Sequence, residues 1–198
     1  MPSGGVATYP AIVTNDGDYA EIVATASHEW THHYLSFYPL GRSYFNSRDA
    51  ETINETVADM VGEEVGGLIL ERWGDPTRSG PRPPTSARSD DLNATLRTLR
   101  TEVDALLAAG KIEEAEARMD AVRGDLVLRG SSIRVINQAF FAWYGTYAAR
   151  PDSVDPLGAQ LYEIRDRTMS LPAFARAIRE VTSRADIEAL LTRLRAVR

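Results

Sequence analysis

Apolar residues recur at intervals of three and four along most of this chain, which places them on one face of an α-helix. The clearest stripe, between about Asp49 and Trp73, consists of Ile53, Val57, Met60, Val61, Val65, Leu68 and Ile69. A strand signal occurs at residues 7–14 (ATYPAIVT), where Pro10 permits only an edge strand. The sequence therefore predicts a mainly α-helical fold with a minimal β edge strand.

The same spacing predicts helices over 19–37, 132–149, 156–168, 171–181 and 184–197. Pro39 and Gly41 are expected to end the first of them, and residues 41–48 and 74–86 are expected to be a loop and a linker. Within 49–73, Gly62 and Gly66 extend a line of small residues that starts at Ala58. Because each glycine costs a helix about 1 kcal/mol, we expect another helix to approach closely there.

Residues 87–130 carry two further helical stripes on either side of Gly110. The stripes consist of Leu92, Leu96, Leu99, Val103 and Leu106, then Ile112, Ala115, Met119, Val122 and Leu126. This pattern predicts an antiparallel helical hairpin inserted into a single domain that spans residues 1–198. An ordinary pair of bundle helices fits the same spacing.

The composition limits the classes of partner. The chain of 198 residues has no cysteine, which excludes disulfides, thiolate metal sites and a cysteine nucleophile. The net charge of -6 argues against nucleic acid, because binding to phosphates requires a basic surface. Residues 1–86 carry 12 acidic and 5 basic side chains, an excess that suits a cation.

Nothing in the sequence indicates a membrane segment, since no stretch approaches the roughly 18 apolar residues of a spanning helix. The first 30 residues lack the basic and apolar regions of a signal peptide. The Gly-rich beginning resembles a loop, which is compatible with a piece of a longer, membrane-anchored or secreted protein. The cellular location and the oligomeric state stay open.

Residues 28–32 (HEWTH) form an HExxH motif within a predicted helix. His28 and His32, four positions apart, share one helical face and could bind one zinc ion at about 2.0–2.1 Å. Glu29 lies about 100° round the helix, so it would contact a metal-bound water rather than the metal. The alternative is that both histidines are ordinary hydrogen-bonded residues at a helix interface.

The segment Asn54-Glu55-Thr56-Val57-Ala58-Asp59 resembles the NExxxD segment of the gluzincins, the thermolysin-like zinc peptidases. The resemblance implies a zincin-like fold, with Glu55 as the third zinc ligand and Asp59 as the hydrogen-bond acceptor of His28. The spacing agrees, because Glu55 and Asp59 share a helical face and a ligating histidine usually donates its other N–H to a carboxylate.

Two other metal sites are excluded by particular residues. A metzincin extension would need Gly at position 35 and His at position 38, where the chain has Leu35 and Tyr38. A ferritin-like di-iron site needs two Glu-x-x-His pairs, and only Glu29 and His32 form one. We expect His33, which lies off the HExxH face, to be a packing or surface residue.

The resemblance implies a zinc-dependent peptidase that holds one Zn²⁺ per chain and acts on a peptide or protein. Two histidines and one glutamate leave a position for water, and Glu29 would serve as the general base. Gluzincins also use a Tyr or His from a later segment to stabilise the oxyanion. No histidine remains, so Tyr144 and Tyr147 are the candidates, followed by Tyr34, Tyr38 and Tyr44.

Two alternatives stay open at this point. The first is a non-catalytic zinc-binding helical interaction module, in which a protein side chain fills the fourth zinc position. The second is a helical scaffold with an accidental motif, which would bind no stoichiometric metal. The sequence also leaves open whether cleavage is endo- or exopeptidic, and the strand at 7–14 could bind an extended substrate by strand addition.

Overall fold

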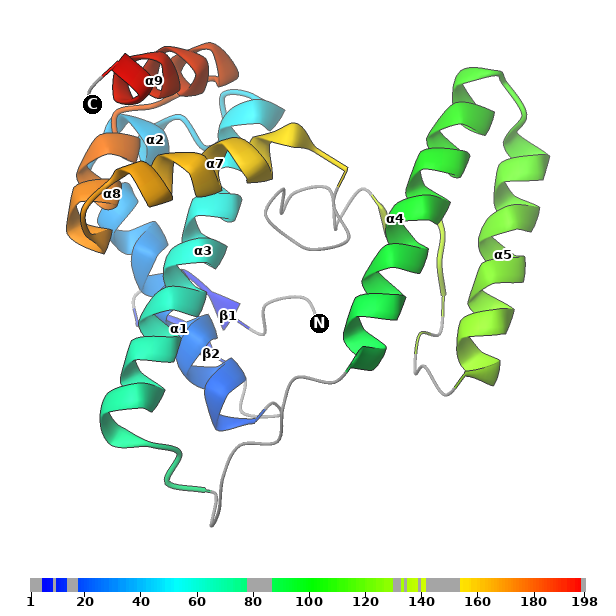
Figure 1. Ribbon diagram of the computed structural model, residues 1–198, viewed down its shortest axis with the longest axis horizontal. Coiled ribbons are helices and arrows are strands. Elements are labelled where there is room, and N and C mark those ends of the chain that lie inside the picture. The colour runs from blue at the N-terminus through cyan, green and yellow to red at the C-terminus, as the bar shows by residue number, and fades with distance from the viewer. Residues whose placement is uncertain are drawn as a thin grey trace. The chain divides into compact units, whose positions relative to one another are not determined.

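The computed structural model describes residues 5–8, 10–13, 18–77, 87–129, 133, 135–138, 140–141 and 154–196, and these are mostly helical (Figure 1). The chain forms two compact units. Unit 1 consists of Met1–Pro81 and Pro156–Arg198, and unit 2 of Arg82–Asp155. Within the described residues, no helix is long and apolar enough to cross a membrane.

Helices α1 (Tyr19–Leu35) and α3 (Arg48–Trp73) form the centre of unit 1. Helix α1 begins with a capping box, in which Glu21 N donates to Asp18 Oδ1 and Asp18 N donates to Glu21 Oε2. Helix α3 is capped by Ser47. The long helix predicted over 49–73 is therefore confirmed.

The two helices approach closely where α3 carries glycine. A Cβ atom added at Gly62 would lie 2.7 Å from Ala24 O and 3.0 Å from His28 Cβ. One added at Gly66 would lie 3.2 Å from Ala24 Cα. The predicted close approach of a second helix at these glycines is thus confirmed, and that helix is α1.

The prediction for residues 36–48 was wrong at residues 36–42, whereas residues 43–47 are the predicted loop. Helix α1 ends at Leu35, and a short helix α2 (Pro39–Arg42) follows where the sequence indicated a stop and a loop. Pro39 begins this helix because the first helical position needs no N–H donor. A Cβ at Gly41 would lie 2.2 Å from Leu35 O, so α2 packs directly against the C-terminal end of α1.

The single strand predicted over 7–14 was also wrong. Strand β1 (Gly5–Val6) pairs antiparallel with β2 (Ile12–Val13), so the segment is a small hairpin rather than one strand. Pro10 lies between the two strands, where Thr8 Oγ1 donates to its carbonyl at 2.7 Å. Proline lacks the N–H donor of a ladder and favours such a connection.

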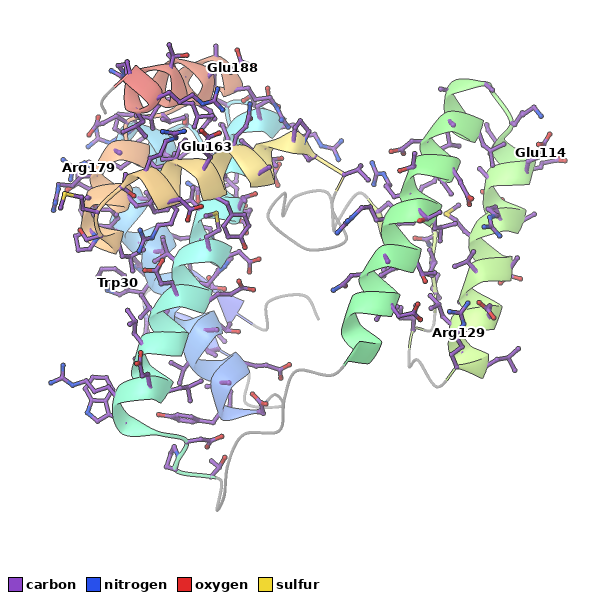
Figure 2. The ribbon with its side chains drawn as sticks, in the orientation of Figure 1. Trp30, Glu114, Arg129, Glu163, Arg179 and Glu188 are labelled. Carbon is purple, nitrogen blue, oxygen red and sulfur yellow. The ribbon has the colours of Figure 1, made fainter. Side chains whose placement is uncertain are left out.

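Three shorter helices complete unit 1, close to their predicted positions: α7 (Pro156–Arg167), α8 (Leu171–Ile178) and α9 (Arg184–Ala196). Their buried residues include Leu161, Phe174 and Ile187. Glu163 of α7, which Figure 2 labels, accepts a hydrogen bond from Arg195 of α9 at 2.8 Å. Arg184, the first residue of α9, donates a hydrogen bond to Asp49 at the start of α3 at 2.8 Å.

In unit 2, helices α4 (Ala87–Ala108) and α5 (Ile112–Leu128) occupy the range of the predicted hairpin and join at Gly110, whose φ is 73°. Leu99 and Met119 are among their buried residues. That this pair is an insertion into one domain stays a prediction. Ile133 and Ile136 are not helical, whereas Gln138, Phe140 and Phe141 are. The other residues of the helix predicted over 132–149, from 142 onward, lie outside the described residues.

Candidate metal centre

His28 and His32 lie one turn apart on the side of α1 that faces α3. His28 is 3% exposed, and its Nε2 atom lies 3.0 Å from His32 Nε2. Trp30, between them in sequence, points away into solvent (Figure 2) and is 64% exposed. The i, i+4 spacing thus brings two imidazole nitrogens together at the interface of the two long helices.

Glu55 of α3 completes a group of three. Its Oε2 atom lies 3.5 Å from His28 Nε2, and its Oε1 atom lies 3.6 Å from His32 Nε2. Donors bound to zinc at about 2.0–2.1 Å in a tetrahedron are about 3.3–3.4 Å apart. The separations of 3.0–3.6 Å, which involve both oxygens of Glu55, lie close to this value, and the group could hold a metal.

Asn54 orients His32, a role that the sequence did not reveal. His32 Nδ1 donates to Asn54 Oδ1 at 2.8 Å, which leaves Nε2 directed at Glu55. Asn54 is 1% exposed, and its Nδ2 atom donates to Leu40 O of α2 at 3.4 Å. The available signal in the sequence was that Asn54 directly precedes Glu55, the candidate ligand.

Asp59 lies on the expected side of His28 but at a longer distance than a normal hydrogen bond. Its Oδ1 atom is 3.9 Å from His28 Nδ1. The carboxylate is half-buried, and the contact is an ion-pair distance from the ring nitrogen that does not face Glu55. The separation of 3.9 Å is that of an ion pair, whereas Asn54 lies within hydrogen-bond distance of His32, so the role of Asp59 as the hydrogen-bond acceptor of His28 stays a prediction.

Tyr44, on the segment between α2 and α3, contacts the candidate ligands. Its hydroxyl donates to Glu55 Oε1 at 2.5 Å, and its ring packs edge-on against His32 with centroids 6.1 Å apart. Tyr34 and Tyr38 instead contact Arg179, through a hydrogen bond at 3.1 Å and a ring stacking at 4.0 Å. The two main candidates, Tyr144 and Tyr147, lie outside the described residues.

Glu55 and His32, two of the candidate ligands, influence each other's pKa. Burial alone would raise the pKa of Glu55, but hydrogen bonds from His28, His32 and Tyr44 outweigh it and hold the pKa well below the ordinary range. Burial likewise opposes the charge on His32, and Glu55 nevertheless raises the pKa of His32 above 6.5. A protonated His32 and an ionised Glu55 therefore stabilise each other's charge.

Glu29 is buried next to this group, with 3% of its surface exposed. Burial raises the pKa of Glu29, and the positive potential of His28 and His32 partly offsets the increase. A carboxyl group whose pKa is raised in this way is a better proton acceptor than one in water. His33 is half-buried, in agreement with its predicted packing or surface role.

Comparison with known proteins adds nothing to this geometry. No protein-family model, curated protein or solved structure matches the chain. The functional interpretation therefore depends on the site itself, namely on which donors converge and on what surrounds them.

Proposed function

We propose that this protein is a zinc-dependent peptidase of the gluzincin type with a zincin-like catalytic domain. One observation carries the proposal. The Nε2 atoms of His28 and His32 and the carboxylate of Glu55 converge from two helices with separations of 3.0–3.6 Å. Two imidazoles and one carboxylate are a ligand set of catalytic zinc sites, in which a fourth position stays open.

Each residue has a role in this proposal. His28, His32 and Glu55 would hold the ion, which would lower the pKa of a bound water and polarise the scissile carbonyl. Glu29 takes the proton of the attacking water and passes it to the leaving amine. The buried position of Glu29 beside the ligands supports this role.

Tyr44 is the oxyanion donor that the contacts favour among the described tyrosines. Its hydroxyl is 2.5 Å from Glu55 Oε1, so it lies directly beside one of the candidate metal ligands. A phenol there can turn from the carboxylate to a developing oxyanion. Tyr144 and Tyr147 remain the sequence-based alternatives.

A non-catalytic zinc-binding module would require a different set of ligands. A structural zinc site is closed by a fourth protein ligand. In the described part of the chain, the metal group has three members, His28, His32 and Glu55. The buried Glu29 can act as a general base in hydrolysis, whereas a purely structural zinc site does not need an acid at this position.

The proposal is tested by measuring zinc content and peptide hydrolysis together. The wild type should bind about one zinc per chain and cleave a peptide library, and Glu29→Gln should keep the zinc and lose cleavage. Glu71→Gln, at an exposed acid on α3, is the matched control and should keep both. Stoichiometric zinc with no cleavage of any peptide would favour the non-catalytic zinc-binding interaction module. The absence of bound zinc would favour the remaining alternative, a helical scaffold with an accidental motif.

A further inference from the structure

Arg179, at the C-terminal end of α8, contacts the stretch of chain that follows His32. Its Nη1 atom donates to Tyr34 Oη at 3.1 Å, and its Cζ atom lies 4.0 Å from the centre of the Tyr38 ring. Its carbonyl oxygen accepts a hydrogen bond from Leu40 N at 3.0 Å. This residue, which Figure 2 labels, therefore holds the end of α1, the connection to α2 and the beginning of α2.

The backbone hydrogen bond joins two helix ends whose polar groups have no partner within their own helices. Leu40 is the second residue of α2, so its N–H has no acceptor in the helix, and the N-cap residue Tyr38 makes no side-chain cap. Arg179 is the C-cap residue of α8, where carbonyl groups lack helical donors. Because Leu40 is 0% exposed, loss of this bond would leave a buried N–H without a partner, which is unfavourable.

From Leu40 the contacts continue to the candidate metal centre. Leu40 O accepts a hydrogen bond from Asn54 Nδ2 at 3.4 Å, and Asn54 Oδ1 accepts one from His32 Nδ1 at 2.8 Å. Asn54 is 1% exposed, so this path from α8 to the ring of His32 runs through the interior of unit 1. Since closely packed interiors transmit strain, a shift of Leu40 changes the direction in which His32 Nε2 points.

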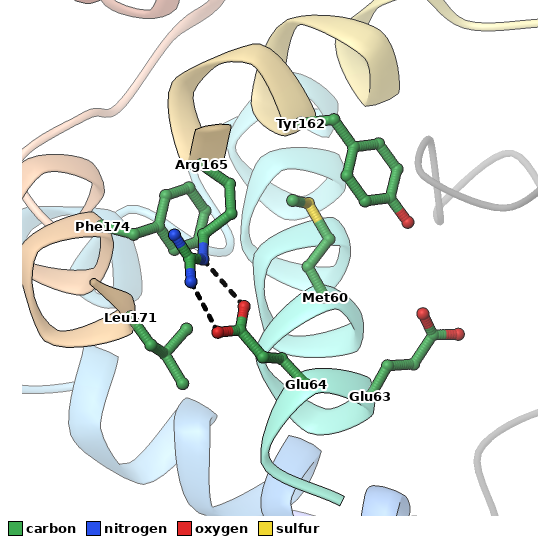
Figure 3. Close-up of a pocket in the computed structure, with 7 residues that line it drawn as sticks. All are labelled: Met60, Glu63, Glu64, Tyr162, Arg165, Leu171 and Phe174. Carbon is green, nitrogen blue, oxygen red and sulfur yellow. Dashed lines mark hydrogen bonds and ion pairs between the residues drawn. The ribbon is translucent and has the colours of Figure 1, made fainter. Parts of the chain in front are cut away.

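Helix α8 is itself held in place by a buried side chain and by α7. Phe174 of α8 is 0% exposed and borders a pocket that residues of α3 and α7 also line (Figure 3). Arg165 of α7 donates to both carboxylate oxygens of Glu64 on α3, at 2.8 and 2.6 Å, and to Thr168 O at 3.2 Å, just before α8. Such a bidentate pair fixes both side chains, so α8 is a firm support for the contacts of Arg179.

From these contacts we infer that Arg179 is a positioning residue of the candidate metal centre. Its side chain holds the end of α1 and the connection to α2, so that its carbonyl oxygen stays at Leu40 N. Through Leu40 and Asn54, it fixes the orientation of His32. The inference rests on the proposed zinc site for its purpose, and it extends the support of that site to a residue far along the chain.

The first test is zinc affinity, measured by competition with a chelator of known affinity. Arg179→Ala should lower the affinity by about 2–30-fold, the range for a residue that contacts no ligand. Tyr34→Phe removes only the hydroxyl that accepts from Arg179 and should lower the affinity less. Arg176→Ala, at an exposed arginine of the same helix, is the matched control and should equal the wild type. Wild-type affinity in Arg179→Ala overturns the inference.

A double-mutant cycle separates positioning from a general loss of stability. If Arg179 acts through Asn54, Arg179→Ala should lower zinc affinity in the wild type and have little further effect in Asn54→Ala. A residue that only supports the fold would lower the affinity by the same factor in both backgrounds. Equal losses therefore overturn the inference, even in an active peptidase. If Arg179→Ala does not fold, Tyr34→Phe takes its place in the cycle.

The third test needs no metal. The chain has 3 histidines, so NMR of labelled imidazole nitrogens reports on His32 directly. In the metal-free wild type, at a pH where this imidazole is neutral, its proton should lie on Nδ1, which donates to Asn54. Arg179→Ala should weaken this preference and leave His33 unchanged. If the wild type binds no zinc, the proposed function fails and this measurement still decides the inference. The same His32 tautomer in both proteins overturns it.

Discussion

His32 is held at its Nδ1 atom by Asn54, 2.8 Å away, and this contact decides which ring nitrogen faces Glu55. The amide oxygen accepts the proton of Nδ1, so the neutral imidazole carries its lone pair on Nε2. A donor oriented in this way loses less freedom when a metal binds.

Removal of this contact should weaken metal binding. We expect Asn54→Ala to lower zinc affinity by about 10–100-fold, and Asn54→Asp, which keeps an acceptor, to lower it much less. Asn46→Ala, at an exposed position, is the control. Competition with a chelator of known affinity measures the change. Equal zinc affinity in Asn54→Ala and wild type would show that the contact does not orient the ligand.

The glycines of α3 offer a matched pair of substitutions. Gly62→Ala places a methyl group 2.7 Å from Ala24 O, and we expect it to lower the free energy of unfolding by about 1–3 kcal/mol. Gly67→Ala meets no atom within 4 Å and should raise it by about 0.5–1 kcal/mol, because alanine favours the helix. Urea denaturation of both variants gives the values. A neutral Gly62→Ala would mean that α1 and α3 have room to separate.

The coupled charges of His32 and Glu55 predict opposite pH trends for folding and for metal binding. Because Glu55 raises the pKa of His32 above 6.5, their contact contributes its full stability below about pH 6.5. That contribution is lost as the pH rises through the raised pKa of the folded protein. Zinc requires the neutral imidazole, so zinc affinity should rise over the same window, by up to about tenfold per pH unit.

Urea unfolding of the metal-free protein and zinc competition, both between about pH 5.5 and 8.5, test these two trends. A zinc affinity that is flat across this range would show that no proton leaves His32 when the metal binds. In the His32→Ala variant, the pH dependence of unfolding should be reduced, since the group that gains the proton is gone.

Tyr44→Phe separates a role in catalysis from a role in packing. Loss of an oxyanion donor should lower kcat by about 10²–10³-fold with little change in KM. Tyr19→Phe, on the half-buried first turn of α1, is the control. Tyr144→Phe and Tyr147→Phe belong in the same series. If either of them loses kcat while Tyr44→Phe retains it, the donor comes from the later segment, as the sequence alone suggested.

The candidate ligands were predictable because each is fixed by spacing within one helix. His28 and His32 are neighbours by helical geometry, and Glu55 was found through the segment that it shares with Asp59. The small residues at Gly62 and Gly66 also indicated that a second helix packs there.

The contacts of Asn54 and Tyr44 were not predictable in the same way. Both cross between elements, and such contacts depend on how α2 turns the chain between α1 and α3. That turn was itself missed, because Pro39 and Gly41 were interpreted as a stop, whereas Pro39 begins a helix. The hairpin at the beginning was missed for a related reason, since two strands of two residues are too short to show alternation.

The hydrogen bond from Leu40 N to Arg179 O has a consequence for fragments of this protein. Leu40 O is also the acceptor of Asn54, so the support of His32 extends through α2 to the end of α8. A peptide cut at residues 19–73 would contain every candidate ligand and still lack the carbonyl that anchors Leu40. A chain that is truncated at its C-terminus before Arg179 would keep its candidate metal-binding residues. It would lose the hydrogen bond that holds Leu40, and through it Asn54 and His32, in place.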